Sequence, residues 1–144
     1  MSATADSSLL VALYLPEATS PAADAACASV SAPVLLTAWH RVEIANAFQR
    51  AVLQGRITAT EAAQLWQDFT ADVNAGRFTI APVDHDAVLA RTHALTQRHT
   101  ATLGTRTLDL IHVASALELG AVDFLSLDTR QRQAATAEGL NVLP

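Results

Sequence analysis

The chain has 144 residues, 51% hydrophobic and 16% charged, which is sufficient for one compact domain with a substantial core. Its formal net charge of -5 argues against binding nucleic acid through a broadly basic surface, so such a contact would require local arginines or a bridging metal ion. All nine basic residues are arginine, which excludes the phosphate-binding loop, Schiff-base enzymes and phospho-aspartate receivers, because each relies on a lysine.

The first half of the chain carries helix-boundary signals between short apolar segments. Pro16 closes the first expected helix, Thr37 can cap another, and Thr58 and Glu61 have the spacing of a capping box. In chain order we expect a strand at 3–6, helices at 8–15 and 21–30, a strand at 33–36, and helices at 38–53 and 58–75.

The second half of the chain alternates strands with helices. Asp84 can cap a helix that ends near Arg98, and residues 99–105 are expected to form a loop. No hairpin signal joins consecutive strands, which predicts one domain, 1–144, of three-layer α/β/α type with a central, mainly parallel sheet of four to five short strands. In chain order we expect a strand at 78–81, helices at 84–98 and 106–119, a strand at 123–128, a helix at 129–138 and a strand at 141–143.

Cysteine use and hydropathy limit the class of protein further. The single cysteine, Cys27, excludes an internal disulfide and a cysteine-cluster zinc site, and we expect it to be a small buried residue. The long apolar run near the amino terminus, 9–15, is too short to span a bilayer, and no arginine precedes it. We therefore expect no signal peptide, no membrane segment and a cytoplasmic protein.

One carboxylate lies within the most apolar helix of the chain. Between Leu108 and Leu119 nearly every helical face is apolar, which predicts a helix enclosed in the core, and Asp109 is inside this run. A buried charge is costly without a cation, a hydrogen-bond network or an opening to solvent. Asp109 therefore either forms a salt bridge with Arg106, three residues earlier, or belongs to a functional site.

Three other acidic residues are candidates for the same site. Asp6 and Asp128 are expected at the carboxyl ends of strands, the edge at which open α/β sheets bind ligands. Glu43 shares a helix face with Asn46 beside the expected core stripe, so both point toward the edge of the core. Taken singly, Asp6 and Asp128 could be helix caps and Glu43 a solvated residue. The expected core stripe of that helix consists of Val42, Ala45, Phe48 and Val52.

Carboxylates that converge have a specific chemistry. They cannot all be ionised without a cation, and hard oxygen ligands suit Mg²⁺ or Mn²⁺. A metal ion held in this way lowers the pKa of a bound water molecule and stabilises the charge that develops on an attacked phosphate. The set Asp6, Glu43, Asp109 and Asp128 therefore predicts hydrolysis of a phosphodiester.

The acidic residues lie in three segments whose order spans essentially the whole chain. The first begins Asp6-Ser-Ser-Leu-Leu, and the second contains Glu43-Ile-Ala-Asn46. The third starts at Arg106-Thr-Leu-Asp109 and ends with Leu127-Asp128-Thr-Arg, and it is the most specific of the three. Together they resemble successive motifs of the PIN-domain ribonucleases, specifically the VapC-type toxins of toxin-antitoxin pairs.

This resemblance implies a Mg²⁺- or Mn²⁺-dependent endoribonuclease with the PIN-like fold, a homodimer that a cognate VapB-type antitoxin holds inactive. By position, Asp6, Glu43, Asp109 and Asp128 would surround the metal ion, with Asp6 and Asp109 as its direct ligands. Attack on the RNA would leave a 5′-phosphate and a 3′-hydroxyl. The supporting polar groups would be Ser7 or Ser8 and Asn46.

Several arginines lie close to these motifs and could hold the RNA backbone. Three are near the carboxyl-terminal motif and two are on the Glu43 helix, and we expect Arg132 to be solvated. The candidates are Arg41, Arg50, Arg106, Arg130 and Arg132.

Other motifs have simpler explanations. Asp84-His-Asp86 imitates the Asp-x-Asp motif of haloacid-dehalogenase-type phosphatases, but that motif normally opens its domain and acts with a lysine, so helix capping by Asp84 explains it better. His40-x-x-Glu43 has metal-ligand spacing but no second pair, and His112 is expected to be a hydrogen-bonded core histidine. The alternative to an enzyme is a catalytically inactive PIN-like protein-interaction module.

Overall fold

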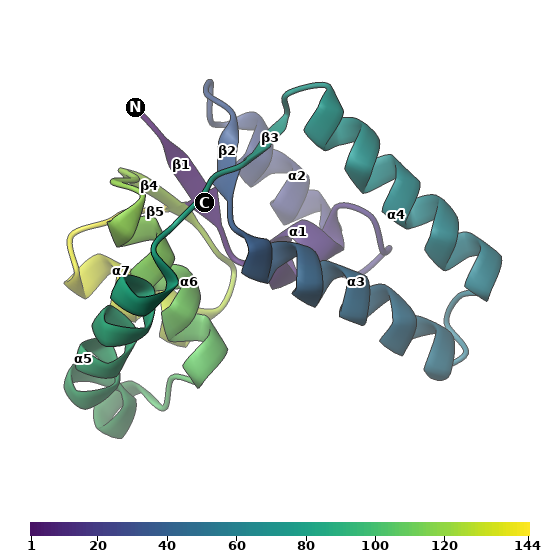
Figure 1. Cartoon of the computed structure of the whole chain (residues 1–144). Helices are drawn as coiled ribbons and strands as arrows, with labels where there is room; N and C mark the ends of the chain where they lie inside the picture. The colour runs from purple at the N-terminus through teal and green to yellow at the C-terminus, as the bar shows by residue number, and fades with distance from the viewer.

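A five-stranded parallel sheet forms the centre of the computed structural model, which describes residues 1–144 (Figure 1). The strand order is β3-β2-β1-β4-β5. From β1 the chain adds β2 and β3 outward on one side and then crosses to β4 on the other side of β1. The predicted parallel sheet is confirmed. The strands are β1 (Ala3–Ala5), β2 (Val34–Leu36), β3 (Phe78–Ile80), β4 (Asp123–Leu125) and β5 (Asn141–Leu143).

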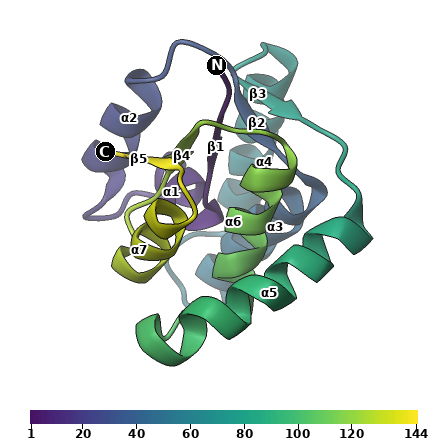
Figure 2. The ribbon, with the colours of Figure 1, turned by 90° about the vertical axis from the view of Figure 1, so that its left-hand side faces the viewer.

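Helices cover both faces of this sheet, as predicted (Figures 1 and 2). Helices α1–α4 pack against one face and α5–α7 against the other. None of them is both long and apolar enough to cross a membrane. The helices are α1 (Ser7–Ala12), α2 (Ser20–Ala28), α3 (Ala38–Leu53), α4 (Ala59–Asn74), α5 (His85–Leu103), α6 (Thr107–Glu118) and α7 (Thr129–Ala137).

Each face of the sheet has its own hydrophobic core. On β4, Phe124 belongs to the cluster with α5–α7, whereas Leu125 belongs to the cluster with α1–α4, as alternation along a strand requires. Every residue of β1, the central strand, is buried although its side chains are only alanine and threonine. Small side chains suit this position because helices cover β1 on both faces, and they let α6 come close to the strand.

The largest boundary difference concerns α5, which continues through Leu103 instead of ending near Arg98. The expected loop at 99–105 is therefore wrong for most of its length. Tertiary contacts extend the helix: His99 is buried and its Nε2 lies 2.7 Å from Glu138 Oε1, while Leu103 packs against the second core. At the other end of the chain, α1 ends earlier than expected, at Ala12, and a turn leads toward Pro16.

The buried stripe of α3 also differs from the expected one. Val42 is 67% exposed, and the stripe is rotated so that His40 forms its first position. A histidine was not counted as a core residue in the sequence pattern, so the apolar residues alone suggested a different face. The residues buried on α3 are His40, Ile44, Phe48 and Ala51.

Gly104 separates α5 from α6 and provides a prediction of modest size. Its φ is 68°, a left-handed conformation that L side chains adopt at a cost. An added methyl group would meet only Arg130 Nη1, at an ordinary contact distance of 3.9 Å. We therefore expect Gly104→Ala to lower the free energy of unfolding by about 1 kcal/mol, and Gly104→Asn by less, because asparagine tolerates this conformation. Urea unfolding of both variants measures the difference; equal stability of Gly104→Ala and wild type would contradict it.

Candidate active site

A cavity of about 380 Å³ opens at the carboxyl edge of the sheet, where β1 and β4 lie side by side. The chain adds strands to one side of β1 first and then, from β4 onward, to the other side. Open α/β sheets bind ligands at such a switch point between strands. All four predicted acidic residues line this cavity, although they come from three separate segments of the chain. They are Asp6, Glu43, Asp109 and Asp128.

Asp6 follows β1 directly and is the most buried of the four, with 4% of its surface exposed. It caps α1, because its Oδ1 accepts a hydrogen bond from the Leu9 amide at 2.6 Å. Hydroxyl groups of Ser8 and Ser126 also donate to the carboxylate, each at 3.0 Å. Burial nevertheless dominates and raises the pKa of Asp6, because no cationic side chain pairs with the carboxylate. A bound cation would offset this cost.

Glu43, on α3, forms a polar cluster with residues from two other helices. The Ser7 hydroxyl donates to Glu43 Oε2 at 2.8 Å, and His112 Nε2 contacts the same oxygen. Burial by itself would raise the pKa of Glu43, but the interactions with His112 and Ser7 outweigh it and lower the pKa. The alternative that Glu43 is a solvated residue is therefore wrong.

His112 is a site residue to which the sequence assigned no role beyond the core. It is buried and hydrogen-bonded, as predicted, but its ring also lines the cavity. Its Nδ1 has no hydrogen-bond partner. The available signal was its position three residues after Asp109, which places both side chains on one face of α6.

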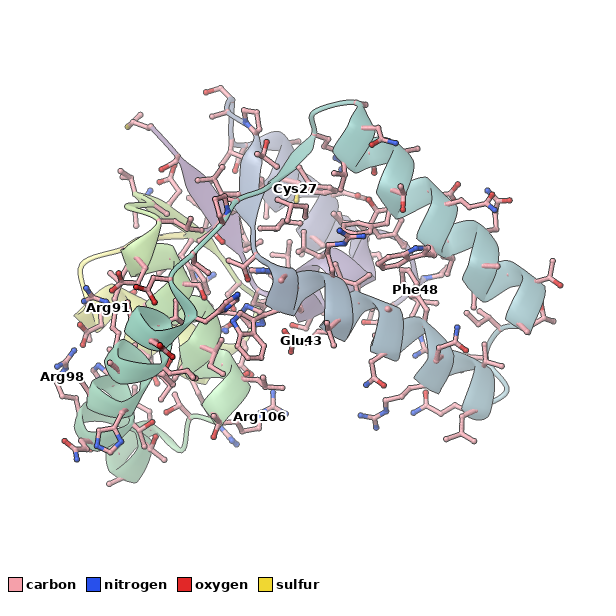
Figure 3. All side chains as sticks on the ribbon, viewed as in Figure 1. Cys27, Glu43, Phe48, Arg91, Arg98 and Arg106 are labelled. Carbon is pink, nitrogen blue, oxygen red and sulfur yellow. The ribbon has the colours of Figure 1, made fainter.

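Asp109 lies at the beginning of α6 rather than deep in its apolar part. The buried stretch of α6 starts at Leu110, whereas Leu108 is 45% exposed, so the expectation of a fully enclosed helix is wrong at this end. The Arg106 amide donates to Asp109 Oδ2 at 3.1 Å, and the Arg106 guanidinium reaches both oxygens, at 3.0 and 3.3 Å. The salt bridge considered from the sequence is thus present, within the cavity. Figure 3 shows Arg106 at the start of α6 and Glu43 on α3.

Asp128 follows β4, which ends at Leu125 and not at Asp128 itself. It caps α7 by accepting a hydrogen bond from the Gln131 amide at 2.9 Å. The Gln131 side chain, absent from the sequence candidates, places its Oε1 2.7 Å from Ser126 Oγ, and its Nε2 donates to the Asp109 carbonyl at 3.0 Å. Gln131 therefore connects the segment after β4 to the beginning of α6 in the cavity wall.

The remaining predicted groups lie in several places. Ser7 and Ser8 line the same cavity, whereas Asn46 lines an adjacent hollow of about 360 Å³ together with Arg50. His40 turns away from Glu43 because its Nε2 bonds the Ala5 carbonyl at 2.7 Å, so its ligand-like spacing is coincidental, as expected.

The arginines differ in their contacts. Arg132 was expected to be solvated, but it donates to the carbonyl groups of Ser126 and Pro144 at 2.7 and 2.8 Å, so that expectation is wrong. Arg41 lies over the Trp66 ring, 5.9 Å from its centre. Of the five candidates, only Arg106 lines the cavity with the four carboxylates.

The Asp-x-Asp motif lies outside the cavity. Asp84 caps α5 by accepting from the amides of Asp86 and Ala87 at 3.0 and 3.1 Å, which confirms the capping role. Neither Asp84 nor Asp86 lines the cavity of the four carboxylates. The arrangement gives no support to the phosphatase alternative.

The donor set fits a hard divalent cation in its chemistry, since four carboxylates share one cavity and the buried Asp6 carboxylate has no cationic partner. In the present side-chain arrangement, however, no three His, Cys, Asp or Glu side chains come close enough to hold a metal ion. The Asp109 oxygens face Arg106 instead. A cation held by Asp6 and Asp109 would compete with the Arg106 guanidinium for the Asp109 carboxylate.

Together, the parallel sheet and the acidic cavity at its switch point define an α/β domain of PIN-like architecture. A solved structure of VapC20 from Mycobacterium tuberculosis, a sarcin-ricin loop cleaving toxin, shares this fold: TM-score 0.70, 18% identity, 99% of this chain and 100% of that one. FitAcB from Neisseria gonorrhoeae is similar, with a TM-score of 0.66 and 16% identity over 99% and 96% of the two chains. No protein-family model and no curated protein sequence matches the chain. The chain thus has the fold of a VapC-type PIN domain, which confirms the fold predicted from its motifs.

Proposed function

We propose that the protein is a metal-dependent endoribonuclease that hydrolyses RNA phosphodiester bonds. The observation that carries this proposal is the convergence of Asp6, Glu43, Asp109 and Asp128 on one cavity at the switch point of the sheet. The fold shared with VapC20, a toxin that cleaves the sarcin-ricin loop, supports a nucleolytic activity. The same fold supports a role as the toxin of a VapBC-type pair.

Within this proposal the side chains have distinct tasks. Asp6 and Asp109 would hold Mg²⁺ or Mn²⁺, which when bound activates water and neutralises charge on the scissile phosphate. Glu43 is ionised at neutral pH, and Ser7 and His112 fix its carboxylate on the cavity wall, where it can accept a proton. Asp128 completes the negative wall from the end of β4.

The proposed partners follow from the same assignment. RNA is the substrate, a VapB-type antitoxin is the inhibitor, and a second copy of the chain forms a homodimer. Because the overall charge is -5, contact with the RNA backbone must be local, and the cavity-lining Arg106 is suited to it.

A catalytically inactive PIN-like interaction module is the second candidate. The observation that favours it is that three of the four carboxylates already have structural tasks: Asp6 and Asp128 cap helices, and Asp109 pairs with Arg106. An inactive module would not bind Mn²⁺ in the cavity. Isothermal titration of the protein with Mn²⁺ therefore separates the two candidates.

The proposed activity predicts metal-dependent cleavage of a mixed RNA pool by the purified protein. We expect cleavage with Mg²⁺ or Mn²⁺ and none with a chelator, because the negative cavity cannot accept a phosphate without a cation. Gel analysis of the RNA products measures this. The Asp84→Asn variant is the matched control and should cleave like the wild type, since Asp84 lies outside the cavity. Cleavage that persists in chelator, or that disappears in Asp84→Asn, would contradict the proposal.

A further inference from the structure

The Arg106 guanidinium binds the carboxylate of Asp109, which the proposed function assigns to a metal ion. It contacts both carboxylate oxygens of Asp109 at 3.0 and 3.3 Å. The pair is asymmetric, because the Arg106 side chain is 75% exposed while that of Asp109 is only 14% exposed. A long, exposed side chain can leave such a contact at small cost, whereas the carboxylate is held in the wall of the cavity.

From this contact we propose that Arg106 is a switch residue: it occupies Asp109 until a divalent cation takes the carboxylate, and its released guanidinium then binds an RNA phosphate at the cavity rim. This inference rests on the proposed function. It adds an order of events, in which the cation both completes the site and frees the side chain that holds the substrate.

The charges around Arg106 favour both positions of its side chain. The hydrogen bond and charge of Asp109, and then the charges of Asp128 and Asp6, stabilise the guanidinium and raise its pKa. A cation bound by these carboxylates would weaken that attraction, and a phosphate of bound RNA would offer the guanidinium another partner. A guanidinium binds phosphate through paired hydrogen bonds as well as it binds a carboxylate.

The local fold does not depend on the guanidinium. The backbone amide of Arg106 also donates to Asp109 Oδ2, at 3.1 Å, which caps the beginning of α6. Substitution of Arg106 by alanine keeps this amide. The variant should therefore retain α6 and change only the competition for Asp109, which far-ultraviolet circular dichroism and thermal unfolding can verify.

Two opposite effects are expected from Arg106→Ala. Without the competing guanidinium, the variant should bind Mn²⁺ about two- to fivefold more tightly than the wild type in calorimetric titration without RNA. Arg130→Ala is the matched control, because Arg130 is also exposed but its side chain donates its hydrogen bond to the Gly104 carbonyl and does not line the cavity. Its Mn²⁺ affinity should change less than twofold.

The second effect of Arg106→Ala should be a weaker influence of the cation on RNA binding. The probe is a single-stranded RNA oligonucleotide, with Ca²⁺ in place of Mn²⁺, and a gel confirms that the RNA stays intact. Under these conditions the cation should strengthen RNA binding to the wild type. We expect this strengthening to be about two- to fivefold greater in the wild type than in Arg106→Ala. In the wild type the release of Arg106 couples cation binding to RNA binding, and the variant lacks this coupling. Fluorescence anisotropy measures both dissociation constants.

The outcomes separate this inference from the proposed function. If Arg106→Ala and Arg130→Ala bind Mn²⁺ equally, or if the cation strengthens RNA binding equally in wild type and Arg106→Ala, the switch is wrong while a metal-dependent nuclease stands. If neither wild type nor Arg106→Ala binds Mn²⁺, the metal site and the switch are both wrong. Mn²⁺ binding by Arg106→Ala but not by the wild type would contradict both the switch and the proposed activity, because the cation would then never displace Arg106 in the natural protein.

Discussion

Replacing Asp6 with asparagine is expected to reduce RNA cleavage about a hundredfold or more while raising the melting temperature at pH 7 by a few degrees. Cleavage falls because the proposed metal ion would lose a carboxylate ligand at the switch point of the sheet. Stability rises because a buried carboxylate without a cationic partner is replaced by a neutral group. Asparagine can keep each contact, since its amide can donate to Ser126 Oγ while Ser126 donates to Gln131.

The pH dependence of this stability gain has a definite sign. Burial raises the pKa of Asp6 above its value of 3.8 in the unfolded chain, so the folded state holds the proton more tightly. The tighter proton binding stabilises the folded wild type fully below pH 3.8, and this stabilisation is lost as pH rises through the folded-state pKa. The melting-temperature difference between Asp6→Asn and wild type should therefore grow from pH 4 toward neutrality, and added Mn²⁺ should reduce it by stabilising only the wild type.

Asp109→Asn is the matched control for Asp6→Asn. It should lose cleavage to a similar degree, but without the gain in stability, because the Asp109 carboxylate is already paired with the Arg106 guanidinium. Unfolding curves and RNA cleavage by both variants test the contrast. Full cleavage by Asp6→Asn, or an equal stability gain in both variants, would contradict the assignment.

His40→Ala is expected to lower the free energy of unfolding by about 3 kcal/mol, or roughly 10 °C in melting temperature. The fully buried imidazole bonds the Ala5 carbonyl at 2.7 Å and accepts from the Thr37 amide at 2.9 Å. Its removal leaves a cavity and two unpaired backbone groups. These bonds connect the end of β1, next to Asp6, to the beginning of α3, so cleavage should weaken as well.

His40 also makes the wild type sensitive to acid. Burial, and then the charge of His112, lowers the pKa of His40 from 6.5 to about 3, so the folded state keeps it neutral. Its contribution is complete above pH 6.5 and is lost as pH falls toward the folded-state pKa, by at most about 1.4 kcal/mol per pH unit. Urea unfolding at several pH values should show a shallower acid slope in His40→Ala. The exposed His93→Ala should keep the wild-type slope, and equal slopes in all three proteins would contradict the prediction.

The elements of this fold were predictable wherever the signal was local. The capping box of Thr58 and Glu61 and the cap by Asp84 lie at the expected helix starts. Strand-helix alternation without hairpin signals was sufficient for the parallel sheet, because parallel strands require crossovers. The acidic candidates were also recognisable, since carboxylates at strand ends and in an apolar helix are costly unless they have a task.

Distant contacts decided what the local signals could not. The extension of α5 to Leu103 depends on His99 meeting Glu138, and the rotation of α3 depends on His40 reaching Ala5. A helical pattern reports which residues are apolar, but a polar side chain becomes a core residue only when a distant partner satisfies it.

The sequence alone was sufficient to predict the fold class, most elements and the four candidate carboxylates, because periodicity, caps and strand ends are properties of neighbouring residues. The three-dimensional packing was needed to show that these carboxylates share one cavity and that His112 contacts Glu43 across the site. It also selected the guanidinium of Arg106, among five candidates, as the one that covers Asp109. Each of these results depends on where whole helices pack, and packing is set by the sum of many distant contacts rather than by any one segment.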